Sequence, residues 1–397
     1  MLKRILIVVL FTVFLLPAAS QAAAVDGVTD TEVTIGMSGP LSGPGALWGV
    51  VLLGANAWVD HINERGGIHG RKIKVIMRDD GYNPARALAN LTEMKGKVFA
   101  VSPLMGTAIV HATKDFLAEN RIFCIGPTVD VRVFEKYPKD KLRWFFISYP
   151  DYINEGEFLA DYAVKSLAGK KLSLFHQNDP MGQMYVEGAK LAISRLPAGR
   201  ASLGVAIPYD VTERALATHA LKLKEGGADI LLISATPTHA ALILKELAKI
   251  DYRPKVLTAS VLGDPIMYSI AGADVWEGVY PAGMAHTGTP GDLAVDRVIE
   301  IIKKYDPKIA GKEYLGLFGA VSMMHVVEGL KNAGRDLTQE SMIKGMEMIK
   351  NWRPEGLGAP VTYGPDRRHG LNGSRLMRAE KGKHVPITDY VIYKPLF

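Results

Sequence analysis

Apolar and polar residues alternate in blocks along most of the chain, and each kind of block predicts one kind of element. Short apolar runs bounded by turn residues indicate buried strands, and between most of them lie helical patterns of about 12 to 20 residues, such as His239–Ile250. Regular alternation of strands and helices indicates parallel sheets with helices on both faces. The expected strands are Val33–Met37, Ile73–Met77, Val98–Ser102, Ile122–Ile125, Leu172–Phe175, Ile230–Ser234, Val256–Ala259 and Val279–Ala282.

The alternation is interrupted near Ser148–Asn154 and ends after about Pro290. Beyond that point we expect helices at Leu293–Lys304, Tyr314–Asn332 and Gln339–Ile349, then short strands around Val361–Tyr363, Arg375–Ala379 and Asp389–Tyr393. A chain of 397 residues is longer than one hydrophobic core usually serves. We therefore expect an α/β protein with more than one domain.

The first residues carry the pattern of a secretion signal. Lys3 and Arg4 precede the apolar run Ile5–Leu16, and the small-residue stretch Ala18–Ala24 follows. The run is shorter than the roughly 20 apolar residues that a membrane-spanning helix needs. We expect residues 1–24 to be a cleaved signal peptide and the mature protein to reside in the periplasm.

Composition and charge narrow the classes of function. The single cysteine, Cys124, cannot form an intrachain disulfide and is expected to pack in the core within the strand IFCIG. The formal net charge is +6 without a block of Lys and Arg, which does not indicate a nucleic-acid partner. The charged run Lys381–Lys383 is expected to be a hairpin turn.

The chain lacks the motifs of common enzyme classes. Gly43–Gly49 approximates a dinucleotide-binding loop, but it has one residue too many before its last glycine. No G-x-S-x-G, H-E-x-x-H or P-loop motif is present. The pair Asp79–Asp80 is expected to tie the following loop GYNPAR through Asx turns and not to form a metal or acid/base site. We therefore expect no catalytic residue, no metal site and no cofactor.

The segment Val33–Asp80 is the most distinctive of the chain. It combines a short apolar strand, the turn-rich loop SGPLSGPGALWG, a long helix that begins beside Trp48, a Gly66–Gly67 stop and a second strand that ends in two acids. This segment and the C-terminal stretch APVTYGPDRRHGLNGSRLMRAEKGKHVPI resemble the type I periplasmic binding proteins, the branched-chain amino-acid (leucine/isoleucine/valine) receptor family of ABC importers. The resemblance covers roughly Val33–Lys394.

The resemblance implies a fold of two Rossmann-like lobes with parallel-rich sheets, joined by three hinge crossings. Carried onto this chain, the crossings lie near Ile147–Asp151, Tyr280–Met284 and Trp352–Val361. Lobe I would then comprise residues 25–148 and 283–355, and lobe II residues 149–282 and 356–397.

The resemblance also implies which residues of lobe I face a ligand. Trp48 matches an aromatic that covers the ligand side chain, although ordinary packing is the alternative. Thr107 opens a helix and matches a carboxylate-binding Ser, because a helix N-terminus favours an anion; it could equally be an N-cap. Thr128 takes a position whose backbone binds the ligand, and Asp130 stands where relatives have Thr or Ser. Phe318 matches a further aromatic.

In lobe II the implied site departs from the family pattern. Met181 stands where Tyr or Phe is usual, Thr236 where amino-acid binders carry an aromatic, and Ser260 where they use an acid to pair the ligand ammonium. A buried ammonium needs a charge partner. Either Asp130 supplies it, or the ligand has no ammonium and Asp130 accepts a hydroxyl.

These residues imply a binding protein that closes on a small hydrophobic carboxylate by a hinge motion. Three readings stay open: a receptor for a branched-chain or related amino acid, a receptor for an aromatic or other non-amino carboxylate, and a sensor subunit for a signalling partner. The expected partners are the small-molecule ligand and an ABC permease in the inner membrane. We expect no nucleic acid and a monomeric protein.

Overall fold

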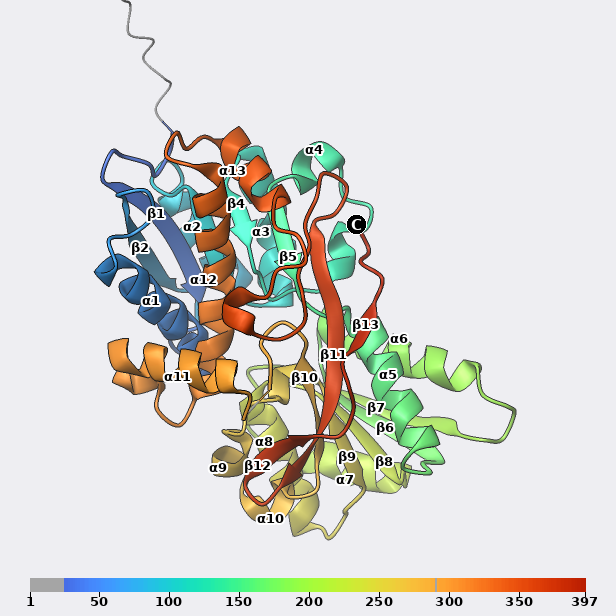
Figure 1. The fold of residues 1–397 in the computed structure, drawn as a ribbon. Coiled ribbons are helices and arrows are strands. Elements are labelled where there is room, and N and C mark those ends of the chain that lie inside the picture. Colours follow the sequence, from blue (N-terminus) through green and yellow to red (C-terminus); the bar gives the residue numbers. More distant parts are fainter. Residues whose placement is uncertain (1–24, 290) are drawn as a thin grey trace, which may run out of the picture.

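The computed structural model describes residues 25–289 and 291–397, so the expected signal peptide at residues 1–24 lies outside the described part. Figure 1 shows an elongated molecule with two lobes, each built around a sheet flanked by helices. Within the described residues, no helix is long and apolar enough to cross a membrane.

The N-terminal lobe contains five parallel strands in the order β2-β1-β3-β4-β5. The chain runs from β1 outward to β2 and then back past β1 to β3, and right-handed crossovers therefore place α1 on one face and α2 and α3 on the other. The strands are β1 (Glu32–Gly39), β2 (Lys72–Asp79), β3 (Ala100–Leu104), β4 (Phe123–Ile125) and β5 (Phe145–Ser148). The helices are α1 (Gly49–Glu64), α2 (Pro84–Met94), α3 (Thr107–Glu119) and α4 (Lys139–Leu142).

Three later helices return to this lobe and cover the face that α1 occupies (Figure 1). They are α11 (Leu293–Tyr305), α12 (Glu313–Ala333) and α13 (Gln339–Glu347). All three agree with the helices expected from the sequence, because their apolar positions follow a helical period. The lobe is therefore assembled from two separate stretches of the chain.

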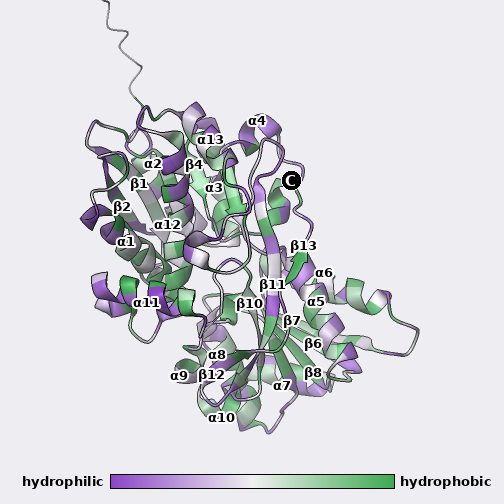
Figure 2. Ribbon diagram, in the orientation of Figure 1, coloured by the Kyte–Doolittle hydropathy of each residue, from purple (hydrophilic) through white to green (hydrophobic). Residues whose placement is uncertain are grey.

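The second lobe contains the strand order β10-β9-β8-β6-β7, again parallel throughout. Its strands are β6 (Lys171–Gln177), β7 (Ser202–Tyr209), β8 (Ile230–Ser234), β9 (Lys255–Thr258) and β10 (Tyr280–Met284). Its helices are α5 (Tyr152–Lys165), α6 (Pro180–Ser194), α7 (Ala217–Gly226), α8 (Pro237–Lys249), α9 (Met267–Ala271) and α10 (Ala273–Trp276). Figure 2 shows that the strands of both sheets are mostly hydrophobic, as expected for sheets covered on both faces.

One long strand, β11 (His369–Glu380), connects the two sheets. Its first residues pair with β5 in parallel, and its middle, around Arg375, pairs with β10 in the antiparallel direction. The third passage between the lobes thus lies within β11, later than the Trp352–Val361 segment that the sequence indicated. The ends of that segment pair with each other in an antiparallel bridge. The exact boundaries of the lobes remain a proposal. We now place the last boundary within β11.

The C-terminal strands complete this connection. β12 (Lys383–Pro386) and β13 (Val391–Tyr393) both pair with β11 in the antiparallel direction. Glu380 pairs with Lys383, and the two residues between them have positive φ angles of 51° and 77°, so the expected hairpin turn is confirmed. The expected core position of Cys124 in β4 is also confirmed, because the thiol is buried and unpaired.

Candidate ligand-binding cleft

The carboxyl ends of the strands in both sheets meet between the lobes, where ligands of open α/β sheets bind. Two neighbouring cavities lie there, and both are lined by Trp48 and Val261. The first cavity is further lined by Tyr82, Met105, Gly106, Thr107, Thr128, Tyr152, Gln177, Met181, Ala235 and Thr236. The second is further lined by Ser260, Gly263, Asp264, Gly283, Met284, Thr287, Gly288, Tyr314, Leu315, Phe318 and Met377.

Both cavities are narrow, with volumes of about 20 Å³ and about 50 Å³. Residues of both lobes line each of them, so the lobes lie in a closed arrangement in which side chains fill most of the cleft. A ligand larger than a few atoms needs the lobes to separate before it enters.

Trp48 lies at the junction of the two cavities and is 7% exposed. The loop before it is fixed by Asp79, whose Oδ1 accepts hydrogen bonds from the N–H groups of Leu41 (2.9 Å) and Ser42 (3.1 Å). Helix α1 then begins at Gly49, where a Cβ atom would lie 2.8 Å from the carbonyl oxygen of Pro40. The ends of β1 and β2 thus hold the tryptophan over the cleft.

The acid pair after β2 has the structural role expected for it. Asp79 accepts the N–H of Gly81 at 2.9 Å, and Asp80 accepts the N–H of Tyr82 at 2.8 Å, which are the Asx turns predicted for this loop. Burial raises the pKa of Asp80 to about 6, although a hydrogen bond from Ser38 (2.8 Å) opposes this shift. The turn directs Tyr82 into the first cavity.

Thr107 is buried in the wall of the first cavity as the first residue of α3. It is not the N-cap, because Gly106 occupies that position with a φ of 114°. Its Oγ1 instead accepts the N–H of Asp130 at 3.2 Å, and the N–H of Gly106 bonds to the carbonyl of Thr128 at 3.2 Å. Both of these threonines line the cavity beside the N-terminus of α3.

Asp130 lines neither cavity, unlike the other predicted site residues. Its side chain is buried, where Oδ1 accepts the N–H of Arg132 at 2.8 Å and Oδ2 lies 3.3 Å from Nε2 of His111. The carboxylate therefore caps the short 3-10 helix Val131–Phe134. This placement does not support a direct contact between Asp130 and a ligand in either cavity.

The predicted residues of lobe II divide between the cavities. Met181 and Thr236 line the first, and Ser260 lines the second, opposite Phe318 from α12. Thr236 is the N-cap of α8, and its N–H donates to the hydroxyl of Tyr209 at 2.8 Å. These residues follow strands β6, β8 and β9, which explains why strand-end reasoning found them.

Sequence reasoning missed several lining residues. Tyr152 follows β5, Gln177 ends β6, and Tyr82 lies three residues after β2. The strand-end rule alone could therefore have indicated all three. Asp264 had no such signal, because it follows β9 only after a 3-10 turn.

Asp264 connects the two lobes across the second cavity. Its Oδ1 accepts the N–H of Ile266 at 2.6 Å, and its Oδ2 accepts the N–H of Leu315, at the start of α12, at 2.8 Å. Burial raises the pKa of Asp264 to about 7, and these backbone bonds oppose the shift only in part. The contact holds the closed arrangement through a group that titrates near neutral pH.

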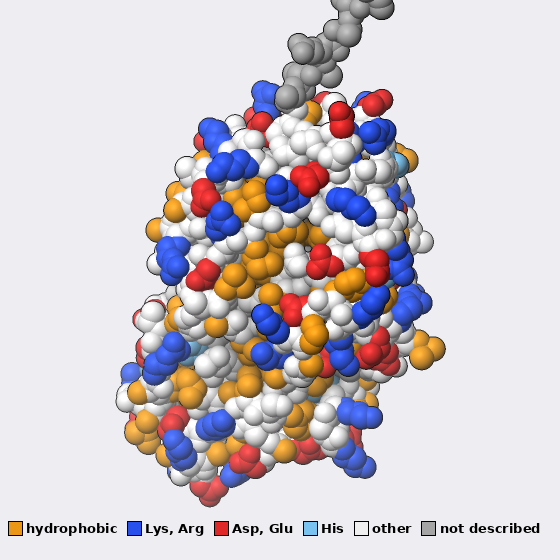
Figure 3. Space-filling model, turned by 90° about the vertical axis from the view of Figure 1, so that its left-hand side faces the viewer, with side chains coloured by type: hydrophobic (Ala, Val, Ile, Leu, Met, Phe, Trp, Pro, Cys, Tyr) orange, Lys and Arg blue, Asp and Glu red, His pale blue; other side chains and the backbone are white. Residues whose placement is uncertain are grey.

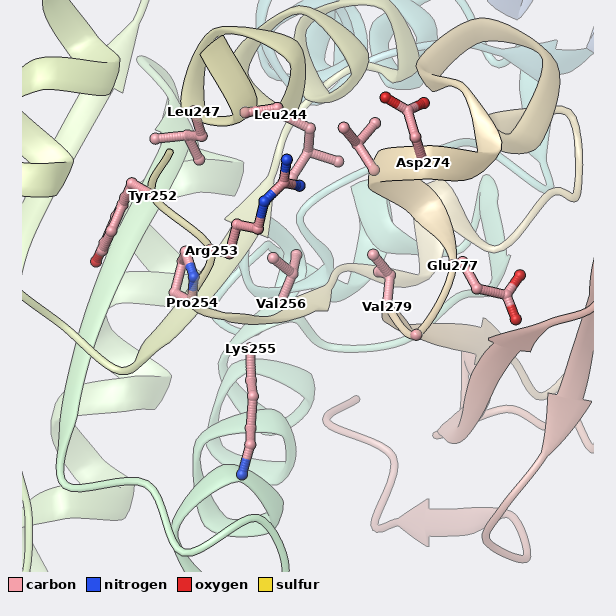
Figure 4. A pocket seen from close by; sticks show the side chains of 13 residues that line it. Leu244, Leu247, Tyr252, Arg253, Pro254, Lys255, Val256, Asp274, Glu277 and Val279 are labelled. Atoms are coloured by element: carbon pink, nitrogen blue, oxygen red, sulfur yellow. The ribbon is translucent and has the colours of Figure 1, made fainter. Parts of the chain in front are cut away.

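A larger cavity of about 320 Å³ lies elsewhere, between α8, α10 and the segment that precedes β9. Figure 4 shows its apolar floor, with Leu244 and Leu247, and the charged side chains of Arg253 and Glu277. It opens at the amino ends of β9 and β10, opposite the strand ends that bind ligands in such sheets. It is therefore not the candidate site.

On the face shown in Figure 3, hydrophobic side chains gather across the middle, with positive and negative side chains mixed around them. In the described part of the chain, no group of three or more His, Cys, Asp or Glu side chains is arranged to hold a metal ion.

Comparisons with known proteins agree with this architecture. A family model described as periplasmic binding protein matches residues 32–383. A Leu/Ile/Val-binding protein homolog from Brucella melitensis is 26% identical over 61% of this chain and 65% of its own length.

Two solved structures share the fold. One is a fatty acid ABC transporter substrate-binding protein from Thermomonospora curvata (TM-score 0.78, 22% identity, 93% of this chain and 94% of that one). The other is a branched-chain amino acid ABC transporter protein from Thermus thermophilus with bound valine (TM-score 0.78, 21% identity, 92% and 98%).

The chain thus belongs to the periplasmic binding proteins, a family of solute receptors and not of enzymes. Its fold is that of the type I periplasmic binding proteins, as the opening and closing motifs of its sequence indicated.

Proposed function

We propose that this protein is the periplasmic substrate-binding component of an ABC importer and that it captures a small hydrophobic carboxylate by hinge closure. The observation that carries the proposal is the first cavity, which is lined by the N-terminus of α3, by aromatic side chains of lobe I and by mostly uncharged, apolar side chains of lobe II. A helix N-terminus attracts an anion, and the surrounding apolar side chains favour an aliphatic or aromatic remainder.

The same geometry supports a hinge motion. Contacts from both lobes stabilise the closed state, and a ligand that bridges them shifts the population toward closure. The closed form would then be recognised by a permease in the inner membrane. We propose that the receptor acts as a monomer, because its cleft is complete within one chain.

The named relatives support this proposal and leave two ligand chemistries open. One is described as a Leu/Ile/Val-binding homolog and one contains valine, whereas another is described as a fatty acid receptor. The alternative ligand, an aromatic or other non-amino carboxylate, is favoured by the absence of a charged side chain among the residues that line the first cavity. A sensor subunit with a signalling partner would use the same cleft.

The proposal is tested by a thermal-shift screen of the mature protein with apolar amino acids, aliphatic acids and aromatic acids, followed by calorimetric titration. We expect at least one carboxylate of these classes to raise the melting temperature, because a ligand that binds the folded state stabilises it. If none binds while other solutes such as sugars do, the ligand class is wrong.

Thr107 gives the proposal a specific variant. Thr107→Val keeps the side-chain volume and removes the hydroxyl beside the helix N-terminus, and we expect the affinity for the carboxylate to fall by roughly 10-fold, the value of about one hydrogen bond. Thr113→Val is the matched control, because its hydroxyl bonds to the carbonyl of Ile109 (2.8 Å) within the same helix. Equal losses in both variants would contradict a role for Thr107 in the site.

A further inference from the structure

Strand β11 changes from one sheet to the other within two residues. Its pairing with β5 ends at Leu371, and its pairing with β10 begins at Ser374. Asn372 and Gly373, between them, pair with β13. A rotation of one lobe against the other needs a bend in β11, and at these two residues no pairing with β5 or β10 resists it. The bend therefore belongs at Asn372 and Gly373.

The side chain of Asn372 joins this point to the first passage between the lobes. Its Oδ1 accepts the N–H of Asp151 at 2.9 Å, and its Nδ2 donates to Oδ1 of Asn154 at 3.0 Å and to the carbonyl of Lys394 at 3.2 Å. Asp151 is the N-cap of α5, the first helix of lobe II, and its Oδ1 accepts the N–H of Ile153 at 3.1 Å. The first and third passages are thus joined where lobe II begins.

A second side chain of β11 contacts the same passage. Nδ1 of His369 accepts the N–H of Leu396 at 3.3 Å, so its Nε2 carries the hydrogen and donates to the carbonyl of Tyr149 at 2.8 Å. The ring is buried, and burial lowers the pKa of His369 to about 4, which keeps the ring neutral. Tyr149 lies two residues before Asp151, so β11 holds both ends of this short segment.

Arg132 holds the carboxylate of Asp151 from lobe I. Its Nε donates to Oδ1 at 3.0 Å and its Nη2 to Oδ2 at 2.6 Å, which makes a bidentate ion pair across the boundary between the lobes. The side chain of Asp151 is 0% exposed, and within residues 25–289 and 291–397 Arg132 is its only ion-pair partner. Arg132 lines neither cavity of the cleft, so the pair acts on the lobes and not on a ligand in those cavities.

We propose that Arg132, Asp151 and Asn372 form the fixed pivot of lobe closure, with Arg132 as a positioning residue. The inference rests on the hinge closure of the proposed function and assigns the point about which the lobes turn. Contacts at the axis of a rotation hardly change their distances, so these bonds remain when the cleft opens. The contact between Asp264 and the start of α12 lies across the cleft and breaks.

A fixed pivot restricts the open protein to one rotation. A receptor that opens along one path loses less conformational freedom when it closes on a ligand than a receptor whose lobes move in several directions. Without the pivot, the lobes of the ligand-free protein should therefore occupy a wider range of arrangements.

The test measures the distance between spin labels on the two lobes of the ligand-free protein. Labels at Ala85→Cys and Thr212→Cys occupy exposed positions in the segments that follow β2 and β7, the outermost strands of the sheet order, which move farthest in a rotation about β11. The native Cys124 is buried. We expect Arg132→Lys to broaden the distance distribution roughly twofold, because lysine keeps the charge but cannot form the bidentate pair.

Arg143→Lys is the matched control. Nη2 of Arg143 contacts both carboxylate oxygens of Glu340, at 2.7 and 2.8 Å, and both residues belong to lobe I. This variant should leave the distribution unchanged. If Arg132→Lys does not fold, the double variant Arg132→Gln with Asp151→Asn takes its place, because it removes both charges together and asparagine keeps the N-cap oxygen. It should broaden the distribution in the same way.

A distribution in Arg132→Lys as narrow as that of the wild type, even with a lower melting temperature, would give Arg132 a structural role alone and overturn the inference. The wild type tests the proposed function separately, with L-leucine, 4-methylpentanoate and benzoate as probes. If one of them shortens the label distance in the wild type while Arg132→Lys stays narrow, only the pivot is overturned. If none shortens it and no carboxylate binds in the thermal-shift screen, the pivot and the proposed function are both overturned.

Discussion

Several polar side chains that line the cleft also form hydrogen bonds to the backbone. Thr236 caps α8 while it lines the first cavity, and Thr107 fixes the N–H of Asp130 while it flanks the N-terminus of α3. A side chain with a fixed hydrogen bond loses little freedom when a ligand arrives, which reduces the entropic cost of binding. The site is therefore preorganised residue by residue.

Trp48 is the residue whose loss should weaken binding most directly. Trp48→Ala removes the side chain that both cavities share, and we expect the affinity to fall by about 1.5–3 kcal/mol, the value of burying a large apolar side chain. The protein has five tryptophans, and a fluorescence change on ligand binding should disappear in this variant. Calorimetric titration gives the affinity.

Trp58→Phe is the control for Trp48, because Trp58 is a buried tryptophan of α1 that lines neither cavity. It should leave the ligand-induced fluorescence change in place. An unchanged affinity in Trp48→Ala would assign Trp48 to packing of the loop before α1.

The candidate site could be predicted in part from the sequence, and the limit has a physical reason. Trp48, Thr107 and Ser260 follow strand ends, and strand ends of parallel sheets converge. Asp264 gave no such signal, because a 3-10 turn separates it from β9. Its place in the cleft results from its contact with the start of α12, which depends on tertiary structure.

At the scale of elements, strand prediction succeeded where burial on both faces gives continuous apolar runs, as in β8 and β9. It failed for β7, whose sequence SLGVAIPY contains a glycine and a proline. β7 is the edge strand of its sheet, where Pro208 removes no hydrogen bond from a central ladder. A proline argues against a strand only where both sides are paired.

Helices α1 and α12 cross at backbone contact through glycines. A Cβ atom on Gly319 would lie 1.7 Å from the carbonyl oxygen of Val51, and one on Gly54 would lie 1.9 Å from that of Gly316. We expect Gly319→Ala to lower the free energy of unfolding by at least about 1–3 kcal/mol, because the helices must separate. Urea unfolding followed by circular dichroism measures the change.

Lys331→Ala is the control in the same helix, at an exposed position near its C-terminus. It should change stability by no more than about 0.5 kcal/mol. If Gly319→Ala were as stable as this control, the close approach of α1 and α12 would be contradicted.

At the scale of the whole molecule, the lobes are joined by covalent passages and by contacts that exist only when they are closed. β11 belongs to both sheets, so it limits how the lobes move relative to each other at that point. The Asp264 contact with the N-terminus of α12 lies across the cleft and can break when the lobes separate. We therefore expect the protonation state of that carboxyl group to affect closure.

Asp264 should make the stability of the closed protein depend on pH. Burial raises its folded-state pKa to about 7, above the 3.8 that is usual for an aspartate, so the folded protein binds the proton more tightly than the unfolded chain does. Stability from this group is present below the unfolded pKa and is lost as pH rises through the folded pKa.

Asp264→Asn cannot titrate and keeps only one acceptor oxygen, so one of the two backbone N–H groups loses its partner. We expect the variant to melt below the wild type at about pH 5 and the gap to narrow toward about pH 8. Asp274→Asn, at an exposed position of the same lobe, should keep a constant difference from the wild type over this range. Melting curves that stay parallel for Asp264→Asn would mean that Asp264 has an ordinary pKa and that closure does not respond to pH through this contact.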